Sequence, residues 1–382
     1  MADLPIVYDS YLKIKDGVVQ DYGEMRNYKN KNESNFTTID ATGRFVLPGF
    51  CDSHTHTVFA KSREGEFVDR INGLTYEEIA LKGGGILNSA KAMQNISEDE
   101  LFEKTIKIIS KIKNSGTSAL EIKSGYGLNK NAELKMLRVI KKIKEKGEIK
   151  IKATLLAAHA YPQEFKNNHQ GYLDLITNEI IPEVSENKLA EYIDVFCERN
   201  YFSVKEMEQI LKAAKKHNLK PKVHVNQFSI LGGIEKAIEY NAISVDHLEE
   251  IGTQDIKALK KSNCIATMLP GCSHFLGIPF GDARKVINNN IALSLASDFN
   301  PGSSPCFNLS TIWSLACVKM KLKPEEAYNA LTVNAAFAMG LENTHGRIAK
   351  GLSPGFILSK KINNLAQIPY FFGESFIEKV FI

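Results

Sequence analysis

Apolar, β-branched runs of strand length alternate along most of the chain with longer segments of helical periodicity. This alternation is typical of a parallel sheet in which each strand is followed by a helix. Eight such strands fit a closed barrel, so the pattern predicts an α/β protein with a (β/α)8 architecture. The predicted strands span residues 45–52, 118–122, 151–157, 193–196, 222–225, 243–246, 265–269 and 291–297.

The segments between these strands have the character of outer-ring helices. In 99–114 and 131–146, Leu, Ile and Val recur at a spacing of three to four residues, which predicts amphipathic helices. A further helix is predicted over 324–339. It begins with Pro324, and the acidic residues that follow suit the positive end of a helix dipole.

The two ends of the chain differ from this central pattern and resemble each other. The first forty or so residues are rich in turns, and short strand-like pieces at 356–358 and 376–382 are separated by Gly and Pro. We therefore expect residues 1–44 and 346–382 to pair into one small composite β domain, a β-sandwich beside a catalytic barrel formed by 45–345.

Composition excludes several classes of protein. A net charge of +4 over 382 residues is slight, and the basic residues are spread along helical segments, which argues against a nucleic-acid partner. Six cysteines occur without a C-x-x-C pair, which favours a reducing compartment. The sequence shows neither a signal-like N-terminus nor an uncharged run long enough to span a bilayer, so a cytoplasmic protein with no membrane partner is expected.

Candidate metal ligands stand at the ends of predicted strands. His54 and His56 follow the first strand, and because side chains alternate along an extended chain, both imidazoles point to the same side. An H-x-H pair is weak evidence alone. His224 in the fifth strand and Asp298 after the eighth strengthen it, since the carboxyl ends of barrel strands converge on one mouth. Three imidazoles and a carboxylate suit one divalent metal, zinc or iron.

A fourth histidine, His247, ends the sixth strand. It could be a fifth ligand or a hydrogen-bonding partner of the reacting groups, and we favour the second role. A two-metal site would call for a bridging lysine after the fourth strand, where this chain has Phe196, Cys197 and Glu198, so one metal is predicted.

The predicted metal site suits hydrolysis. A bound metal ion lowers the pKa of water and polarises a carbonyl group. Asp298 is placed to accept the proton of the water and pass it to a leaving nitrogen, and His247 could stabilise the oxyanion.

Longer motifs are similar to those of the amidohydrolase superfamily, and more narrowly to its members that open an imidazolone ring carrying a propanoate side chain. The resemblance runs essentially end to end. It rests on segments 47–56, 73–80, 83–86, 121–128, 157–160, 194–198, 246–248 and 297–302, together with Arg63.

This resemblance implies hydrolysis of 4-imidazolone-5-propanoate to N-formimino-L-glutamate, with His54, His56, His224 and Asp298 holding zinc or iron. It further implies roles in substrate binding for Arg63, Tyr126, His159, Gln227, Asn300, Gly302 and Ser303. A guanidinium at Arg63 suits a substrate with a free carboxylate.

One departure from the family concerns Gln227. The family commonly has glutamate at this position, and glutamine cannot take a proton, so Gln227 is expected to hydrogen-bond the ring while proton transfer passes to Asp298 or His247.

Two alternatives remain open on the sequence. Another amidohydrolase reaction, such as nucleobase deamination or opening of a different cyclic amide, would use the same ligands. A catalytically inactive metal-binding homologue is the second alternative, although the complete ligand set argues against it. By analogy with the superfamily, a homodimer is expected.

Overall fold

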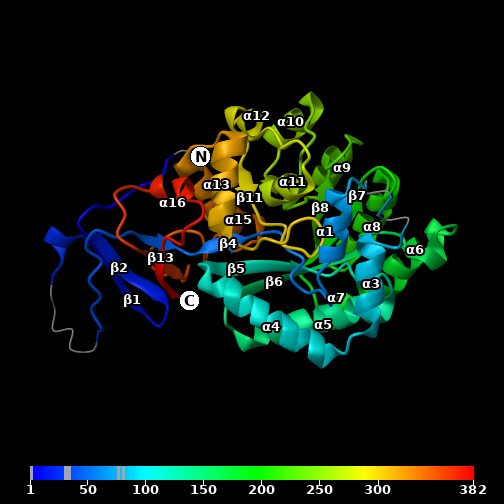
Figure 1. Cartoon of the computed structure of the whole chain (residues 1–382), viewed down its shortest axis with the longest axis horizontal. Helices are drawn as coiled ribbons and strands as arrows, with labels where there is room; N and C mark the ends of the chain where they lie inside the picture. The colour runs from blue at the N-terminus through cyan, green and yellow to red at the C-terminus, as the bar shows by residue number, and fades with distance from the viewer. Residues whose placement is uncertain (1–2, 30–35, 75–77, 80–81) are drawn as a thin grey trace.

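The computed structural model describes residues 3–29, 36–74, 78–79 and 82–382, and residues 75–77 and 80 of the motif at 73–80 lie outside them. Within this part of the chain, eight parallel strands form one sheet in sequential order, surrounded by helices (Figure 1). The predicted α/β barrel is thereby confirmed. The barrel strands are β4 (Phe50–Asp52), β5 (Thr117–Lys123), β6 (Lys150–Ala158), β7 (Tyr192–Cys197), β8 (Lys220–Val225), β9 (Ser244–His247), β10 (Ile265–Met268) and β11 (Leu293–Leu295).

The first and last strands meet just beyond their carboxyl ends. A parallel bridge joins Thr55 and Phe299, and the backbone N–H of His56 donates to the carbonyl of Phe299 at 2.8 Å. The N–H of Asp298 donates to the carbonyl of His54 at 3.0 Å. The barrel is therefore closed at the level where the predicted metal ligands lie.

The prediction of a single strand over 45–52 was wrong. The segment divides into β3 (Val46–Pro48) and β4, which belong to different sheets. Gly49 stands between them, and a Cβ at this position would lie 2.6 Å from Ser118. The chain can pass this close to β5 only where a residue has no side chain.

The helices cover the outside of the barrel. The segments predicted at 99–114 and 131–146 are confirmed as α4 (Glu98–Asn114) and α5 (Lys130–Lys146). The others are α1 (Glu64–Ile71), α3 (Gly85–Asn95), α6 (His169–Leu175), α7 (Ile181–Glu186), α8 (Val204–Lys216), α9 (Gly233–Glu239), α10 (Thr253–Lys260), α11 (Pro270–Leu276), α12 (Ala283–Asn288), α13 (Leu309–Met320), α14 (Pro324–Leu331), α15 (Val333–Ala338) and α16 (Gln367–Tyr370), with short 3-10 turns Met25–Asn27 and Gln163–Phe165 and a π-helical turn Ile176–Ile180.

The single helix predicted over 324–339 was also wrong. It breaks into α14 and α15 at Thr332, whose φ of −128° and ψ of −85° are not helical. The Thr332 hydroxyl donates to the carbonyl of Tyr328 at 2.7 Å. A β-branched residue that bonds back to the preceding turn weakens a helix at that point.

The two chain ends do come together beside the barrel (Figure 1). A two-stranded sheet pairs β1 (Ser10–Lys15) with β2 (Val18–Glu24), and a three-stranded sheet has the order β13 (Ile377–Phe381), β12 (Phe356–Ser359), β3. Backbone hydrogen bonds of 2.9 Å link Val19 to Gly351 and Leu352. Because β3 falls inside the range assigned to the barrel, one strand of the small sheet comes from beyond the predicted boundary at residue 44.

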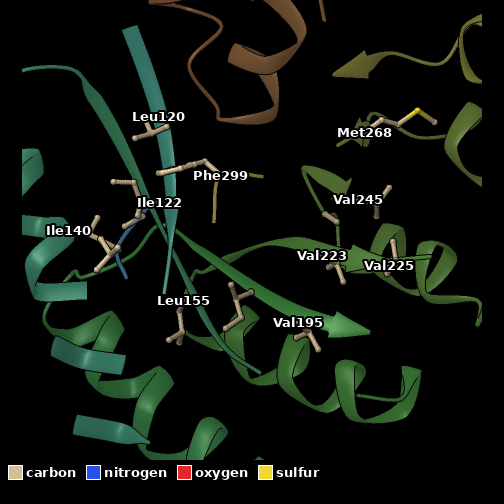
Figure 2. Close-up of a cluster of buried hydrophobic side chains, with 14 of the residues drawn as sticks. Leu120, Ile122, Ile140, Leu155, Val195, Val223, Val225, Val245, Met268 and Phe299 are labelled. Atoms are coloured by element: carbon tan, nitrogen blue, oxygen red, sulfur yellow. The ribbon is translucent and has the colours of Figure 1, made fainter. Parts of the chain in front are cut away.

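Side chains of the barrel strands alternate between two environments. Apolar residues such as Ile122, Val195 and Val245 belong to the large hydrophobic core, which also includes Ile140 of α5 (Figure 2). The adjacent Lys123, Asp194 and Asp246, together with His224 of β8, are also buried but contact one another. The alternation thus places apolar groups against the helices and charged groups inside the barrel. No helix among the described residues is long and apolar enough to cross a membrane.

Candidate metal centre and active site

Four predicted ligands meet at the mouth of the barrel. The closure described above places the Oδ1 atom of Asp298 3.4 Å from the Nε2 atom of His56 and 3.6 Å from the Nε2 atom of His54. The Nε2 atoms of His54 and His224 are 3.1 Å apart. All four side chains are buried.

Two carboxylates fix the orientation of the imidazoles. Nδ1 of His54 lies 2.7 Å from Asp246, and Nδ1 of His224 lies 2.8 Å from Asp194. An ionised carboxylate only accepts hydrogen bonds, so each Nδ1 carries the proton and each Nε2 presents a lone pair. Burial lowers the pKa of His224 to about 4, which keeps it neutral.

These atoms fit a cation. Two unprotonated Nε2 atoms and a carboxylate oxygen would repel one another at these distances without a positive charge between them. Two ligands about 2.0–2.1 Å from a tetrahedral zinc ion are separated by about 3.4 Å. The observed separations of 3.1, 3.4 and 3.6 Å are close to this value. His54, His56, His224 and Asp298 would therefore hold one divalent cation.

A buried lysine behind the ligands was missed from the sequence. The Nζ atom of Lys123 lies 2.8 Å from Glu121, 2.8 Å from Asp194 and 3.7 Å from Asp246. Burial acts to lower the pKa of Lys123, but these carboxylates outweigh it and raise the pKa above its ordinary value. The lysine therefore stays charged and balances the two carboxylates that orient the ligands. Charged residues inside otherwise apolar strands were the available signal.

His247 lies beside the four ligands. Its ring centroid is 5.1 Å from that of His224, and its Nδ1 atom is 3.3 Å from Glu249. Burial opposes a charge on His247, but the carboxylates of Glu249, Asp298 and Asp246 outweigh this and raise its pKa above the ordinary value. This histidine can therefore hold a proton beside the reacting groups.

The backbone is strained where these side chains leave their strands. His247 has φ of 92° and Asp298 has φ of 52°, in the left-handed region that side chains with a Cβ rarely adopt. Such strain costs on the order of 1–3 kcal/mol per residue and is concentrated at functional sites. It turns both side chains towards the mouth directly after the strand.

A pocket opens over the metal ligands, and most predicted substrate-binding residues line it. Its lining includes Arg63, Tyr126, His159, Gln227, Asn300 and Ser303, together with His56, His224, His247 and Asp298. His54 is fully buried and does not appear among the lining residues.

Arg63 lies on one wall of this pocket, next to the start of α1. Its guanidinium contacts Glu66 at 2.8 and 2.9 Å, and only 7% of its side chain is exposed. A Cβ on Gly302 would lie 2.4 Å from the guanidinium carbon of Arg63, so the glycine leaves the room that this group occupies. The predicted carboxylate anchor and the predicted glycine loop are thus in direct contact.

The remaining predicted residues occupy the other walls. His159 stacks on His56 with ring centroids 5.2 Å apart and contacts the Gly125 carbonyl through Nδ1 at 3.0 Å. Gln227 donates to the sulfur of Cys272 at 3.5 Å. The side chain of Asn300 is used within its own loop, since its oxygen accepts from the backbone N–H groups of Gly302 and Ser303, at 2.8 and 2.7 Å. Asn300 therefore shapes the loop.

Two further residues beside His247 were not singled out from the sequence. Glu249 follows β9 by two residues and Cys272 lies in the first turn of α11, and both are buried close to His247. No sequence motif links Glu249 to Cys272, because β9 and α11 come together only in the folded barrel.

Comparisons with known proteins agree with this geometry. Residues 45–382 match the model of the amidohydrolase family. The chain is 51% identical to imidazolonepropionase of Christiangramia forsetii and 52% identical to that of Flavobacterium johnsoniae, covering 100% of this chain and 92% of each relative. It is 40% identical to imidazolonepropionase of Thermoanaerobacter pseudethanolicus, over 100% of this chain and 90% of that protein.

Solved structures share the fold at lower identity. Guanine deaminase from C. acetobutylicum with bound guanine superposes with a TM-score of 0.72 at 17% identity, covering 100% of this chain and 95% of that chain. An adenosine deaminase from Xanthomonas campestris with bound zinc gives a TM-score of 0.73 at 13% identity, covering 98% of this chain and 87% of that chain. The family model and the close relatives, rather than these distant structures, place the sequence: the chain belongs to the amidohydrolase family and, within it, to the imidazolonepropionase group.

Proposed function

We propose that the chain hydrolyses 4-imidazolone-5-propanoate to N-formimino-L-glutamate, a step in histidine degradation, using one zinc or iron(II) ion. The observation that carries the proposal is that three of the four candidate metal ligands, His56, His224 and Asp298, line the same pocket as the buried Arg63. The names of relatives at 49–52% identity over the full chain support the same substrate.

The residues present can perform each step. A divalent cation at the four ligands would lower the pKa of a water molecule and polarise the ring carbonyl. Burial acts to raise the pKa of Asp298, but its hydrogen bond to His56 and the nearby imidazoles outweigh this and hold the pKa below its usual value. Asp298 is therefore ionised and can accept the proton of the water as the water oxygen adds to the carbonyl carbon.

The second step breaks the ring C–N bond. Asp298 or His247 delivers a proton to the leaving nitrogen, so that one water is consumed and the carbonyl becomes a carboxylate. His247 donates a hydrogen bond to the oxyanion that forms between the two steps. Gln227 binds the ring by hydrogen bonds and moves no proton.

Arg63 distinguishes this reaction from its rivals. A buried guanidinium binds a carboxylate through two parallel hydrogen bonds, whereas a neutral nucleobase offers it no charge. The presence of His56, His224, Asp298, His247 and Arg63 around one pocket, with His54 buried beside them, argues against an inactive homologue. The expected homodimer stays a prediction.

The first experiment follows the loss of imidazolonepropanoate absorbance with purified protein, with bound metal counted by elemental analysis. Wild type should consume the substrate while holding one metal ion per chain. Asp298→Ala should hold metal more weakly and lose turnover, whereas Asp174→Ala, a change at an exposed position of α6, should behave as wild type. Wild-type protein that holds metal but leaves the substrate intact would contradict the proposal.

A second experiment tests the substrate class. Arg63→Met should lower kcat/KM for imidazolonepropanoate by roughly ten- to a hundred-fold, because hydrogen bonds to charged groups contribute about 1.5–3 kcal/mol. For the uncharged analogue in which an amide replaces the propanoate carboxylate, Arg63→Met should lower kcat/KM much less. Equal losses on both compounds would show that Arg63 does not bind the propanoate.

A further inference from the structure

A second group of potential ligands lies against the first, with none of the four proposed metal ligands in it. His247, Glu249 and Cys272 each offer one ligand atom, and these atoms all lie within 4.8 Å of one another. All three residues are buried. They come from the end of β9, the turn after it and the first turn of α11, so the barrel fold alone brings them together.

The carboxylate of Glu249 has one oxygen without a hydrogen bond. Its Oε1 atom accepts a hydrogen bond from Ser273 at 3.1 Å and lies 3.4 Å from Nδ1 of His247. Its Oε2 atom is buried and has no hydrogen-bond partner among the residues that the structure describes, and it lies 3.3 Å from Nδ1 of His247. A buried polar atom without a partner is rare and costly. The 3.3 Å between Oε2 of Glu249 and Nδ1 of His247 is close to the distance of about 3.4 Å between two ligand atoms of a tetrahedral zinc ion.

Cys272 determines which cations suit the group. A thiolate, an imidazole and a carboxylate form the mixed sulfur, nitrogen and oxygen set that zinc accepts, with a fourth position left for water. Magnesium and calcium prefer oxygen ligands alone. A cation that binds the sulfur of Cys272 displaces the thiol proton to bulk water.

We propose that His247, Glu249 and Cys272 form a second cation site, filled by excess zinc, whose occupancy inhibits the enzyme. The cation would bind His247 at Nδ1, where the imidazole faces Glu249. His247 would then keep a proton only at Nε2 and could not exchange it with the substrate and Asp298. This inhibition rests on the proposed function, whereas binding of the second cation does not.

Metal stoichiometry tests the site directly. The protein is dialysed to equilibrium against rising zinc concentrations and its metal is counted by elemental analysis. Wild type should hold one ion at low zinc and two at excess zinc, while Cys272→Ser, which keeps an acceptor for Gln227, should hold one throughout. Cys264→Ser removes another buried thiol, in a separate pocket that Asn290 also lines, and should still hold two. Cobalt should give thiolate charge-transfer absorption with the second equivalent in wild type and none in Cys272→Ser.

Turnover provides the second readout. Excess zinc should inhibit wild type, and Cys272→Ser should require more than ten times as much zinc for the same inhibition. Loss of a residue that only orients a metal ligand already lowers metal affinity by roughly ten-fold, and loss of a ligand itself should lower it further. Glu249→Gln serves as a second variant if Cys272→Ser does not fold. The proposed second site is overturned if wild type holds a single ion at every zinc concentration. It is also overturned if Cys272→Ser and Glu249→Gln both hold two ions. If stoichiometry follows the expectation but no protein consumes imidazolonepropanoate, the proposed function fails and the site stands.

Discussion

Replacing Lys123 by methionine should destabilise the protein and weaken its hold on metal together. The lysine lies 2.8 Å from Glu121, 2.8 Å from Asp194 and 3.7 Å from Asp246, with all side chains fully buried. With an effective dielectric constant of about 20, each contact at 2.8 Å is worth about 6 kcal/mol of attraction and the third about 4.5 kcal/mol. Desolvation of the ions offsets most of this attraction, and removing one partner of a buried group costs about 3–5 kcal/mol.

The assay is denaturant unfolding followed by the fluorescence of Trp313, the single tryptophan of the chain, which is fully buried. Lys123→Met should lower the free energy of unfolding by about 3–5 kcal/mol in metal-free protein. The loss should be smaller with metal bound, because the cation restores positive charge near Asp194 and Asp246. Metal affinity should fall by roughly 10- to 100-fold, since both carboxylates orient ligands.

Lys222→Met is the matched control. Lys222 is equally buried, but among the residues that the structure describes its Nζ atom contacts one carboxylate, Glu121 at 3.3 Å, and otherwise donates to Ser244 and the carbonyl of Ala338. It should cost stability without changing metal affinity. The reasoning is refuted if Lys123→Met unfolds at the wild-type denaturant concentration, or if both variants weaken metal binding equally.

Three further changes test other parts of the site. Gly302→Ala should raise KM several-fold with less effect on kcat, because the added Cβ would lie 2.4 Å from the guanidinium of Arg63; steady-state kinetics on imidazolonepropanoate measure this. Asp194→Asn should weaken metal binding roughly 10- to 100-fold in competition with a chelator, because His224 loses the carboxylate that orients it. Burial raises the pKa of Asp52 from 3.8 to about 7, so its contribution to stability is present below about pH 4 and is lost as the pH rises through 7. Asp52→Asn should remove this dependence, about 4 kcal/mol, from the pH profile of unfolding of metal-free protein.

Each of these has an outcome that would contradict it. Gly65→Ala adds a methyl group with nothing within 4 Å, so a KM change equal to that of Gly302→Ala would rule out displacement of Arg63. Unchanged chelator competition in Asp194→Asn would mean that the carboxylate does not orient the ligand. A pH profile for Asp52→Asn parallel to that of wild type between pH 4 and 7 would mean that Asp52 ionises normally.

The sequence by itself determined the barrel strands and the residues that end them. Alternation of apolar and polar residues is a local property, so strands such as β5 and β8 and helices such as α4 and α5 could be predicted to within a few residues. It also placed His54 and His56 on one side of an extended segment. The errors at Gly49 and Thr332 have a different origin, because contacts interrupt elements whose local pattern is continuous. Gly49 passes close to Ser118, and the Thr332 hydroxyl donates to the carbonyl of Tyr328.

Only the tertiary structure decided which of these residues meet. The pairing of the chain after β4 with the chain after β11 brings Asp298 to the two histidines across more than two hundred residues, and no local periodicity encodes that distance. The charge balance around Lys123 and the grouping of Glu249 and Cys272 with His247 arise in the same way. Side chains on different strands become neighbours only when the barrel closes, since closure fixes which strand ends face one another.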